Sequence, residues 1–128
     1  MIGIDTESRV ARTSLDREYD ILATVQIATP KNVFIFDAIG MRKNKVKYEP
    51  ICEFFKKKDV KIIGHTLAGD MNHDVTSLFG YTGKVECQQI DVSPLFGVLY
   101  PEERRGLTNV CKVLLGKELC KQYTMTNW

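Results

Sequence analysis

The chain has 128 residues, a hydrophobic fraction of 44% and a formal net charge of +2 at pH 7, which suits one globular domain with a hydrophobic core. This mild charge permits a nucleic-acid partner without requiring one, and no apolar run approaches the roughly 18 residues that a membrane-spanning helix needs. The four cysteines form no C-x-x-C pair, so we expect no zinc site, and we expect free thiols in an intracellular compartment, nuclear or cytoplasmic.

Three strands are predicted in the first third of the chain. The polar stretch 8–20, which shows little periodicity, is interpreted as a loop between the first two. The second strand is apolar on both faces, as interior strands are, and a short turn separates it from the third, so these two must pair antiparallel. The expected strands run through Ile2 and Ile4, over 21–29 and over 33–36.

The rest of the chain alternates helices with strands. A basic loop over 41–47 precedes the first helix, and apolar residues at helical spacing or in short β-branched runs define the later elements. The order predicts an α/β fold with a mixed sheet of about five strands flanked by helices. The expected helices cover 48–58, 71–79, 93–100 and 107–115, and the expected strands cover 60–63 and 85–92.

Two carboxylates follow the first strand. Asp5 and Glu7 are two residues apart, so in a strand both side chains point to the same side. Carboxylates held that close repel each other, and a hard cation such as Mg²⁺ or Mn²⁺ between them relieves the repulsion. The alternative is a solvated strand end, and a bare Asp-x-Glu does not decide between the two.

A second acidic stretch leaves the fourth strand. Asp70 lies near the start of the next helix, where the dipole favours a carboxylate, and Asp74 follows one turn later. Ligands collect at the carboxyl ends of parallel strands, so Asp70 is expected to approach Asp5 and Glu7. Asp70 and Asp74 as plain capping or surface acids remain the alternative.

His65 is more often a hydrogen-bonded strand-end histidine than a ligand. Turn-capping roles are expected for Asp37 and Asp91.

Four segments in order along the chain resemble the DEDD-type 3′–5′ exonucleases, in particular the branch of RNase D and the Werner-type exonuclease domain. Residues 2–7, Ile-Gly-Ile-Asp-Thr-Glu, resemble the first motif, and Gly64-His65 followed by Asp70 resembles the second. Residues 25–29 and 107–128 resemble the segments that follow the first motif and lead to the third. The third motif of this branch, Tyr-x-x-x-Asp, comes after an Asn-Trp segment, and the sequence ends at Trp128. We therefore interpret 1–128 as a single 3′–5′ exonuclease-like domain that lacks its C-terminal motif.

The resemblance implies a ribonuclease H-like fold with the first strand central, and a mechanism that uses two divalent cations, Mg²⁺ or Mn²⁺. It implies that Asp5, Glu7 and Asp70 are the catalytic and metal-binding residues. The implied partner is the 3′ end of a single-stranded nucleic acid, with RNA weakly favoured over DNA. The residues expected to contact the strand are His65, Arg42, Lys43, Lys45, Arg104 and Arg105.

Two other functions stay open at this point. One is an exonuclease-like module that binds nucleic acid or a protein without cleaving. The other is an unrelated α/β enzyme that uses the acids for different phosphate chemistry, although the sequence contains no Gly-rich phosphate-binding loop to support it.

Overall fold

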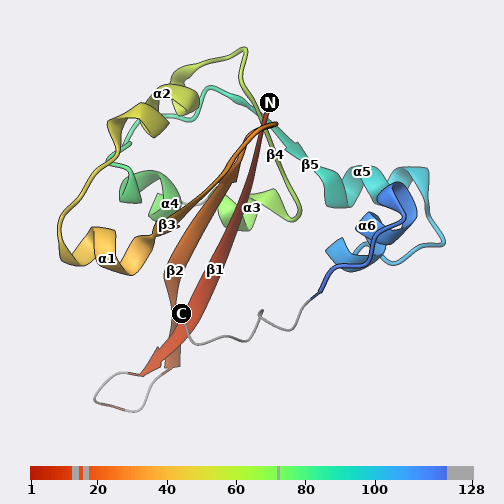
Figure 1. Ribbon diagram of the computed structural model, residues 1–128, viewed down its shortest axis with the longest axis horizontal. Helices are drawn as coiled ribbons and strands as arrows, with labels where there is room; N and C mark the ends of the chain where they lie inside the picture. The colour runs from red at the N-terminus through yellow and green to blue at the C-terminus, as the bar shows by residue number, and fades with distance from the viewer. Residues whose placement is uncertain (13–14, 16–17, 72, 121–128) are drawn as a thin grey trace.

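A computed structural model describes residues 1–12, 15, 18–71 and 73–120, and Figure 1 shows their arrangement. Five strands form one mixed sheet with the order β3-β2-β1-β4-β5. Among the described residues, no helix is both long and apolar enough to cross a membrane. The strands are β1 (Ile2–Arg12), β2 (Glu18–Ala28), β3 (Val33–Asp37), β4 (Lys61–Gly64) and β5 (Gln88–Asp91).

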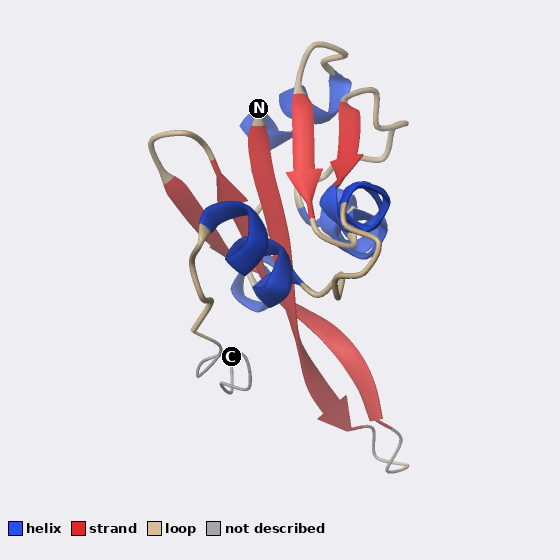
Figure 2. Ribbon diagram, turned by 90° about the vertical axis from the view of Figure 1, so that its right-hand side faces the viewer, coloured by secondary structure: helices blue, strands red, loops and turns tan. Residues whose placement is uncertain are grey.

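The first strand is central, as predicted. β1 pairs antiparallel with β2 and parallel with β4, and the strand order is visible across the sheet in Figure 2. β4 in turn pairs parallel with β5. The sheet therefore joins an antiparallel hairpin to a parallel half, which confirms the predicted α/β architecture. The strands β4 and β5 end beside the middle of β1, which carries Asp5 and Glu7 within the strand and not after it as predicted.

The prediction of a loop over 8–20 is wrong. β1 continues to Arg12 and β2 begins at Glu18, and these two residues pair across the hairpin with an Arg12 Nη2 to Glu18 Oε1 distance of 2.9 Å. The hairpin projects beyond the helices (Figure 1), so both of its faces meet solvent and its sequence lacks the apolar alternation by which strands are recognised. A register shift between Glu7 and Ser8 marks the start of this projecting part.

Six helices cover the sheet within the described residues, and three of them differ from expectation. A short helix begins where a basic loop was predicted, because the Asp37 carboxylate accepts from Gly40 N at 2.8 Å and two cations occupy its last turn. The helix predicted over 71–79 covers only His73–Leu78, and a further short helix, Leu67–Asp70, was not predicted, so Asp70 ends a helix instead of lying near the start of one. The helices are α1 (Ala38–Lys43), α2 (Glu49–Lys56), α3 (Leu67–Asp70), α4 (His73–Leu78), α5 (Val92–Leu99) and α6 (Leu107–Leu115).

The helices lie in two layers. Helices α1, α2 and α4 cover one face of the sheet, and α5 and α6 lie on the other side (Figure 1). The main core lies under the first layer, where Phe55, Phe79 and Ile62 are at most 1% exposed. The buried cysteines Cys52 and Cys87 are free thiols, as predicted. On the other face, a pocket lies between α6 and the sheet, next to Asp5.

Candidate functional site

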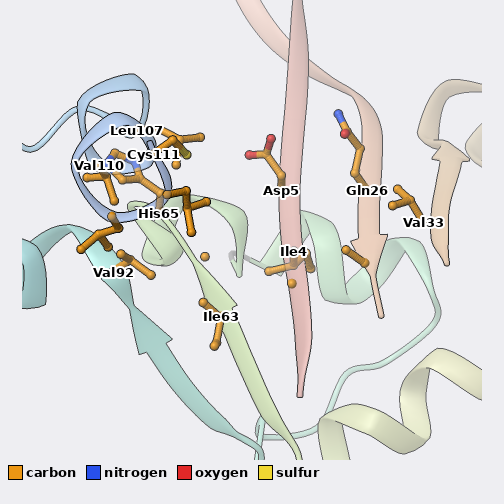
Figure 3. A pocket seen from close by; sticks show the side chains of 15 residues that line it. Ile4, Asp5, Gln26, Val33, Ile63, His65, Val92, Leu107, Val110 and Cys111 are labelled. Atoms are coloured by element: carbon orange, nitrogen blue, oxygen red, sulfur yellow. The ribbon is translucent and has the colours of Figure 1, made fainter. Parts of the chain in front are cut away.

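The first acidic pair lies in the middle of the sheet. Asp5 sits on β1 and is exposed, and Figure 3 shows its carboxylate directed toward α6. An apolar pocket of about 480 Å³ separates α6 from the sheet at this point. Its walls are aliphatic apart from a few polar groups, and residues that line it include Asp5, Gln26, His65, Leu107, Val110 and Cys111.

The carboxylate of Asp70 is oriented by Thr6, the residue between the two acids of the first pair. Asp70 ends α3 and is 8% exposed, which is unusual for a carboxylate. The hydroxyl of Thr6, the residue between Asp5 and Glu7, donates a hydrogen bond to Asp70 Oδ1 at 2.6 Å. The strand β1 thus supplies both the acidic pair and the group that orients the third carboxylate.

Mutual repulsion connects the three carboxylates. Burial raises the pKa of Glu7, and the charges of Asp5 and Asp70 raise it further. Burial also raises the pKa of Asp70; the Thr6 hydroxyl lowers it in part, and the charge of Asp5 adds to the rise. The structure therefore brings the predicted acids within electrostatic reach of one another, at a place where negative charge is disfavoured.

The carboxylates do not already surround a common point. Within residues 1–12, 15, 18–71 and 73–120, no three Asp, Glu, His or Cys side chains stand close enough together to hold a metal ion. The Asp70 carboxylate is turned to the hydroxyl of Thr6. The side chain of Asp74 lies outside the described residues. Oxygen-only donors under mutual repulsion still match the chemistry that Mg²⁺ or Mn²⁺ requires.

A more polar pocket of about 440 Å³, called the acid pocket below, adjoins these residues. It opens along β1 and β2 and reaches the turn that follows β4. Because Asp5 borders both this pocket and the one beneath α6, the carboxylate stands at the junction of the two. Residues lining the acid pocket include Asp5, Thr6, Asp20, Leu22, His65 and Asp70.

His65 is a hydrogen-bonded histidine at the end of a strand. Its Nε2 lies 2.6 Å from the carbonyl oxygen of Arg105, and its Nδ1 lies 3.2 Å from Thr66 Oγ1. A carbonyl oxygen only accepts, so Nε2 carries the proton and Nδ1 accepts from the hydroxyl. The imidazole thereby joins the end of β4 to the turn before α6, and its place at the rim of both pockets follows from this bond.

Asp91 fixes the turn that leads to α3. Its carboxylate accepts from the backbone N–H groups of Thr66, Leu67 and Ser93 at 3.0, 2.9 and 2.9 Å. Burial opposes the charged form, but these three bonds outweigh it and lower the pKa of Asp91. The predicted capping role is confirmed, as it is for Asp37. The hydrogen bond from the Thr66 N–H to Asp91 was not predicted, because no local spacing in the sequence indicates it. Thr66 has φ of 61°.

The basic residues predicted along the strand path lie in two places. Arg42, Lys43 and Lys45 belong to α1 and the turn after it, whereas Arg104 and Arg105 lie between α5 and α6 on the other side of the sheet (Figure 1). The Arg105 side chain lies against Gly97 and therefore packs on α5. The two groups do not form one continuous basic surface, and a role for either in binding stays a prediction.

Comparisons with known proteins identify the family and the fold. A family model described as 3′-5′ exonuclease matches residues 1–128. Among solved structures, Escherichia coli RNase D superposes with a TM-score of 0.70 at 19% identity, over 99% of this chain and 31% of that one. The catalytic core of RRP6 from Trypanosoma brucei gives 0.68 at 19%, over 99% and 32%, and the Aedes aegypti Nibbler EXO domain gives 0.61 at 18%, over 99% and 64%.

The shared part is a fraction of each larger protein. The chain spans 64% of the Nibbler EXO domain and about a third of the other two structures. At these identities the superpositions establish the fold, which is that of the ribonuclease H-like exonucleases. A search of curated protein sequences found no significant relative.

Proposed function

Because the chain belongs to the 3′–5′ exonuclease family, we propose that it hydrolyses phosphodiester bonds at the 3′ end of a single strand in a reaction that needs divalent cations. One observation carries this proposal. Asp5, Glu7 and Asp70, which come from β1 and the segment after β4, lie within electrostatic reach of one another, and Asp5 borders both the apolar pocket and the acid pocket. A binding surface for a polyanion gains nothing from such charge unless a cation joins it.

The carboxylate oxygens of Asp5, Glu7 and Asp70 would hold Mg²⁺ or Mn²⁺. When bound, such cations would supply a lowered pKa for the attacking water and charge stabilisation for the leaving 3′ oxygen. The Thr6 hydroxyl donates to Asp70 Oδ1, so in this proposal Asp70 Oδ2 would face the cation. Glu7, whose pKa is raised, would accept a hydrogen bond from the attacking water and so orient it.

The remaining residues position the substrate. The apolar pocket beneath α6 is large enough for a nucleoside, and its aliphatic walls would contact the base and sugar next to Asp5. Its rim is set by His65, which holds the turn before α6 through the Arg105 carbonyl. RNA is the favoured substrate class, supported by the similarity to RNase D, which is described as an exoribonuclease involved in structured RNA processing.

A second function is favoured by one observation. The Asp70 carboxylate is directed at Thr6, and no three described carboxylate, thiol or imidazole groups stand at metal-binding spacing. A module that binds nucleic acid or a protein without cleaving would show this arrangement permanently. In an enzyme, the carboxylates would instead move together when cations bind.

A cleavage assay separates the two. A chain extended past Trp128 through a Tyr-x-x-x-Asp segment, supplied with Mg²⁺ or Mn²⁺, should shorten a 5′-labelled single strand to a ladder, and the Asp5→Asn variant should not. Residues 1–128 alone lack the Tyr-x-x-x-Asp segment, so the attacking water should be poorly positioned and cleavage should be no more than trace. A misplacement of the reacting atoms by about 1 Å already costs on the order of a hundredfold in rate. Paired ribo- and deoxyribo-oligonucleotides test the preference for RNA. Retained cleavage by Asp5→Asn would end the assignment.

A further inference from the structure

A third pocket lies on the layer opposite α6 and is strongly basic. It has a volume of about 360 Å³ and lies between the turn after α1 and helix α4. Three cations, Arg42, Lys45 and Lys47, line it together with aliphatic side chains and Ser77, and no acidic residue is among its lining residues. We call it the basic pocket.

The cations of the basic pocket are not neutralised within the part of the chain that the structure describes. The ion pairs of the described residues involve other cations, namely Arg12, Lys56, Lys58 and Lys112. The dipole of α1 accounts for Arg42 in the last helical turn, but Lys45 and Lys47 lie beyond the helix. Three like charges around one hollow repel one another unless an anion joins them.

The backbone holds these cations together. After α1 the chain reverses at Lys45, which has φ of 53°, and Val46 N donates to Met41 O at 2.9 Å. This left-handed turn, unusual for a lysine, returns the chain beside Arg42. The aliphatic stem of Lys47 rests on Gly80, where a Cβ would lie 2.9 Å from Lys47 Cδ. Since Gly80 also has φ of 85°, a side chain there is disfavoured twice.

The basic pocket adjoins the acid pocket. Arg42 Nη1 donates to the carbonyl oxygen of Leu22 at 3.4 Å, and Leu22 also lines the acid pocket with Asp5 and Asp70. Arg42 therefore extends from one pocket to the strand that borders the other.

We propose that Arg42, Lys45 and Lys47 form an auxiliary site for the phosphodiester backbone of a single strand, upstream of the 3′ end that the carboxylates receive. The inference rests on the proposed function for the direction of the strand. The contacts are to phosphates, so the site holds the strand without reading its sequence. It lies on the side of the sheet away from Arg104 and Arg105, which take no part in it.

The test is the salt dependence of binding, measured by fluorescence anisotropy in EDTA so that no cleavage intervenes. The probes are labelled oligouridylates of fifteen and three nucleotides. The variant Arg42→Gln/Lys45→Asn/Lys47→Gln removes the three charges, and Asn tolerates the left-handed conformation at position 45. The matched control, Lys56→Gln/Lys57→Gln/Lys58→Gln, removes three charges at the end of α2. Circular dichroism establishes that both variants fold.

For a single strand, each phosphate that a cation of the protein neutralises steepens the slope of the logarithm of the binding constant against the logarithm of the salt concentration by about 0.7. Because the pocket variant loses three cations, its slope on the long probe should be shallower by about 2. The control should keep the wild-type slope, and the short probe should bind the variant and the wild type alike. Equal slopes for the pocket variant and the control on the long probe would overturn the proposal. So would an equal weakening on both probes together with full competition by inorganic phosphate, since that pattern describes a small-anion site.

The outcome is independent of cleavage. If the extended chain fails to cut but the slopes differ as expected, the auxiliary site stands and the exonuclease assignment falls. If it cuts and the slopes are equal, the assignment stands and the auxiliary site falls.

Discussion

The hydroxyl of Thr6 offers a direct test of how the acidic positions are organised. Replacing Thr6 by Val keeps the shape of the side chain and removes the donor to Asp70 Oδ1, leaving a carboxylate that is 8% exposed without that partner. Hydrogen bonds to charged groups contribute about 1.5–3 kcal/mol. Because Thr6 is only half-buried, we expect the low end, about 1.5 kcal/mol. For a domain of this size that corresponds to a fall in melting temperature of roughly 5 °C.

The matched control is Thr6→Ser, which keeps the hydroxyl and loses one methyl group, a change of about 0.8 kcal/mol. Val has the higher strand propensity, so propensity alone would make Thr6→Val the more stable variant. Thermal unfolding followed by circular dichroism in EDTA should instead give the order wild type, Thr6→Ser, Thr6→Val. The gap between the variants should narrow as Asp70 becomes protonated at low pH, because the charged acceptor forms the stronger bond. A Val variant at least as stable as the Ser variant would refute this reasoning.

Three further outcomes follow from the same residues. In EDTA at pH 7, Asp5→Asn should raise the free energy of unfolding by about 0.5–1 kcal/mol, because it removes one of the crowded charges; a sharp fall in melting temperature would make Asp5 structural. Glu7→Gln should also stabilise at pH 7. Its gain should vanish as the pH falls below 4.5, the ordinary pKa of Glu, since a raised pKa in the folded chain penalises only the ionised form; a gain that grows on acidification would reverse the sign of our argument. Asp91→Ala should destabilise by about 2–3 kcal/mol in urea unfolding, because three backbone N–H groups lose their acceptor, and Asp91→Asn should cost less.

The architecture and the convergence of the acids could be predicted because they follow from patterns along the chain. Apolar alternation locates the interior strands, and the carboxyl ends of parallel strands must share an edge, so Asp5 and Asp70 approach each other although they are far apart in sequence. Short loops likewise fix which strands are antiparallel. These inferences need no knowledge of side-chain orientation.

The features that could not be predicted depend on how the elements are oriented relative to one another, or lie in segments exposed to solvent. The bond from Thr6 to Asp70 requires the relative placement of β1 and α3, which no spacing encodes. The hairpin beyond Glu7 has polar residues on both faces, so burial leaves no pattern there. Helix α1 is six residues long and too short for periodicity to show. The separation of Arg42 from Arg104 likewise depends on which side of the sheet each crossover takes.

The central claim is that Asp5, Glu7 and Asp70 together bind divalent cations, and titration of the 128-residue chain with Mn²⁺ tests it most directly. Electron paramagnetic resonance measures free Mn²⁺ and needs neither substrate nor catalysis. Asp37→Asn serves as the control, because that carboxylate caps α1 away from the acid pocket. We expect Asp5→Asn and Asp70→Asn each to weaken Mn²⁺ binding at least tenfold while Asp37→Asn leaves it unchanged. Equal affinity in all four proteins would contradict the account.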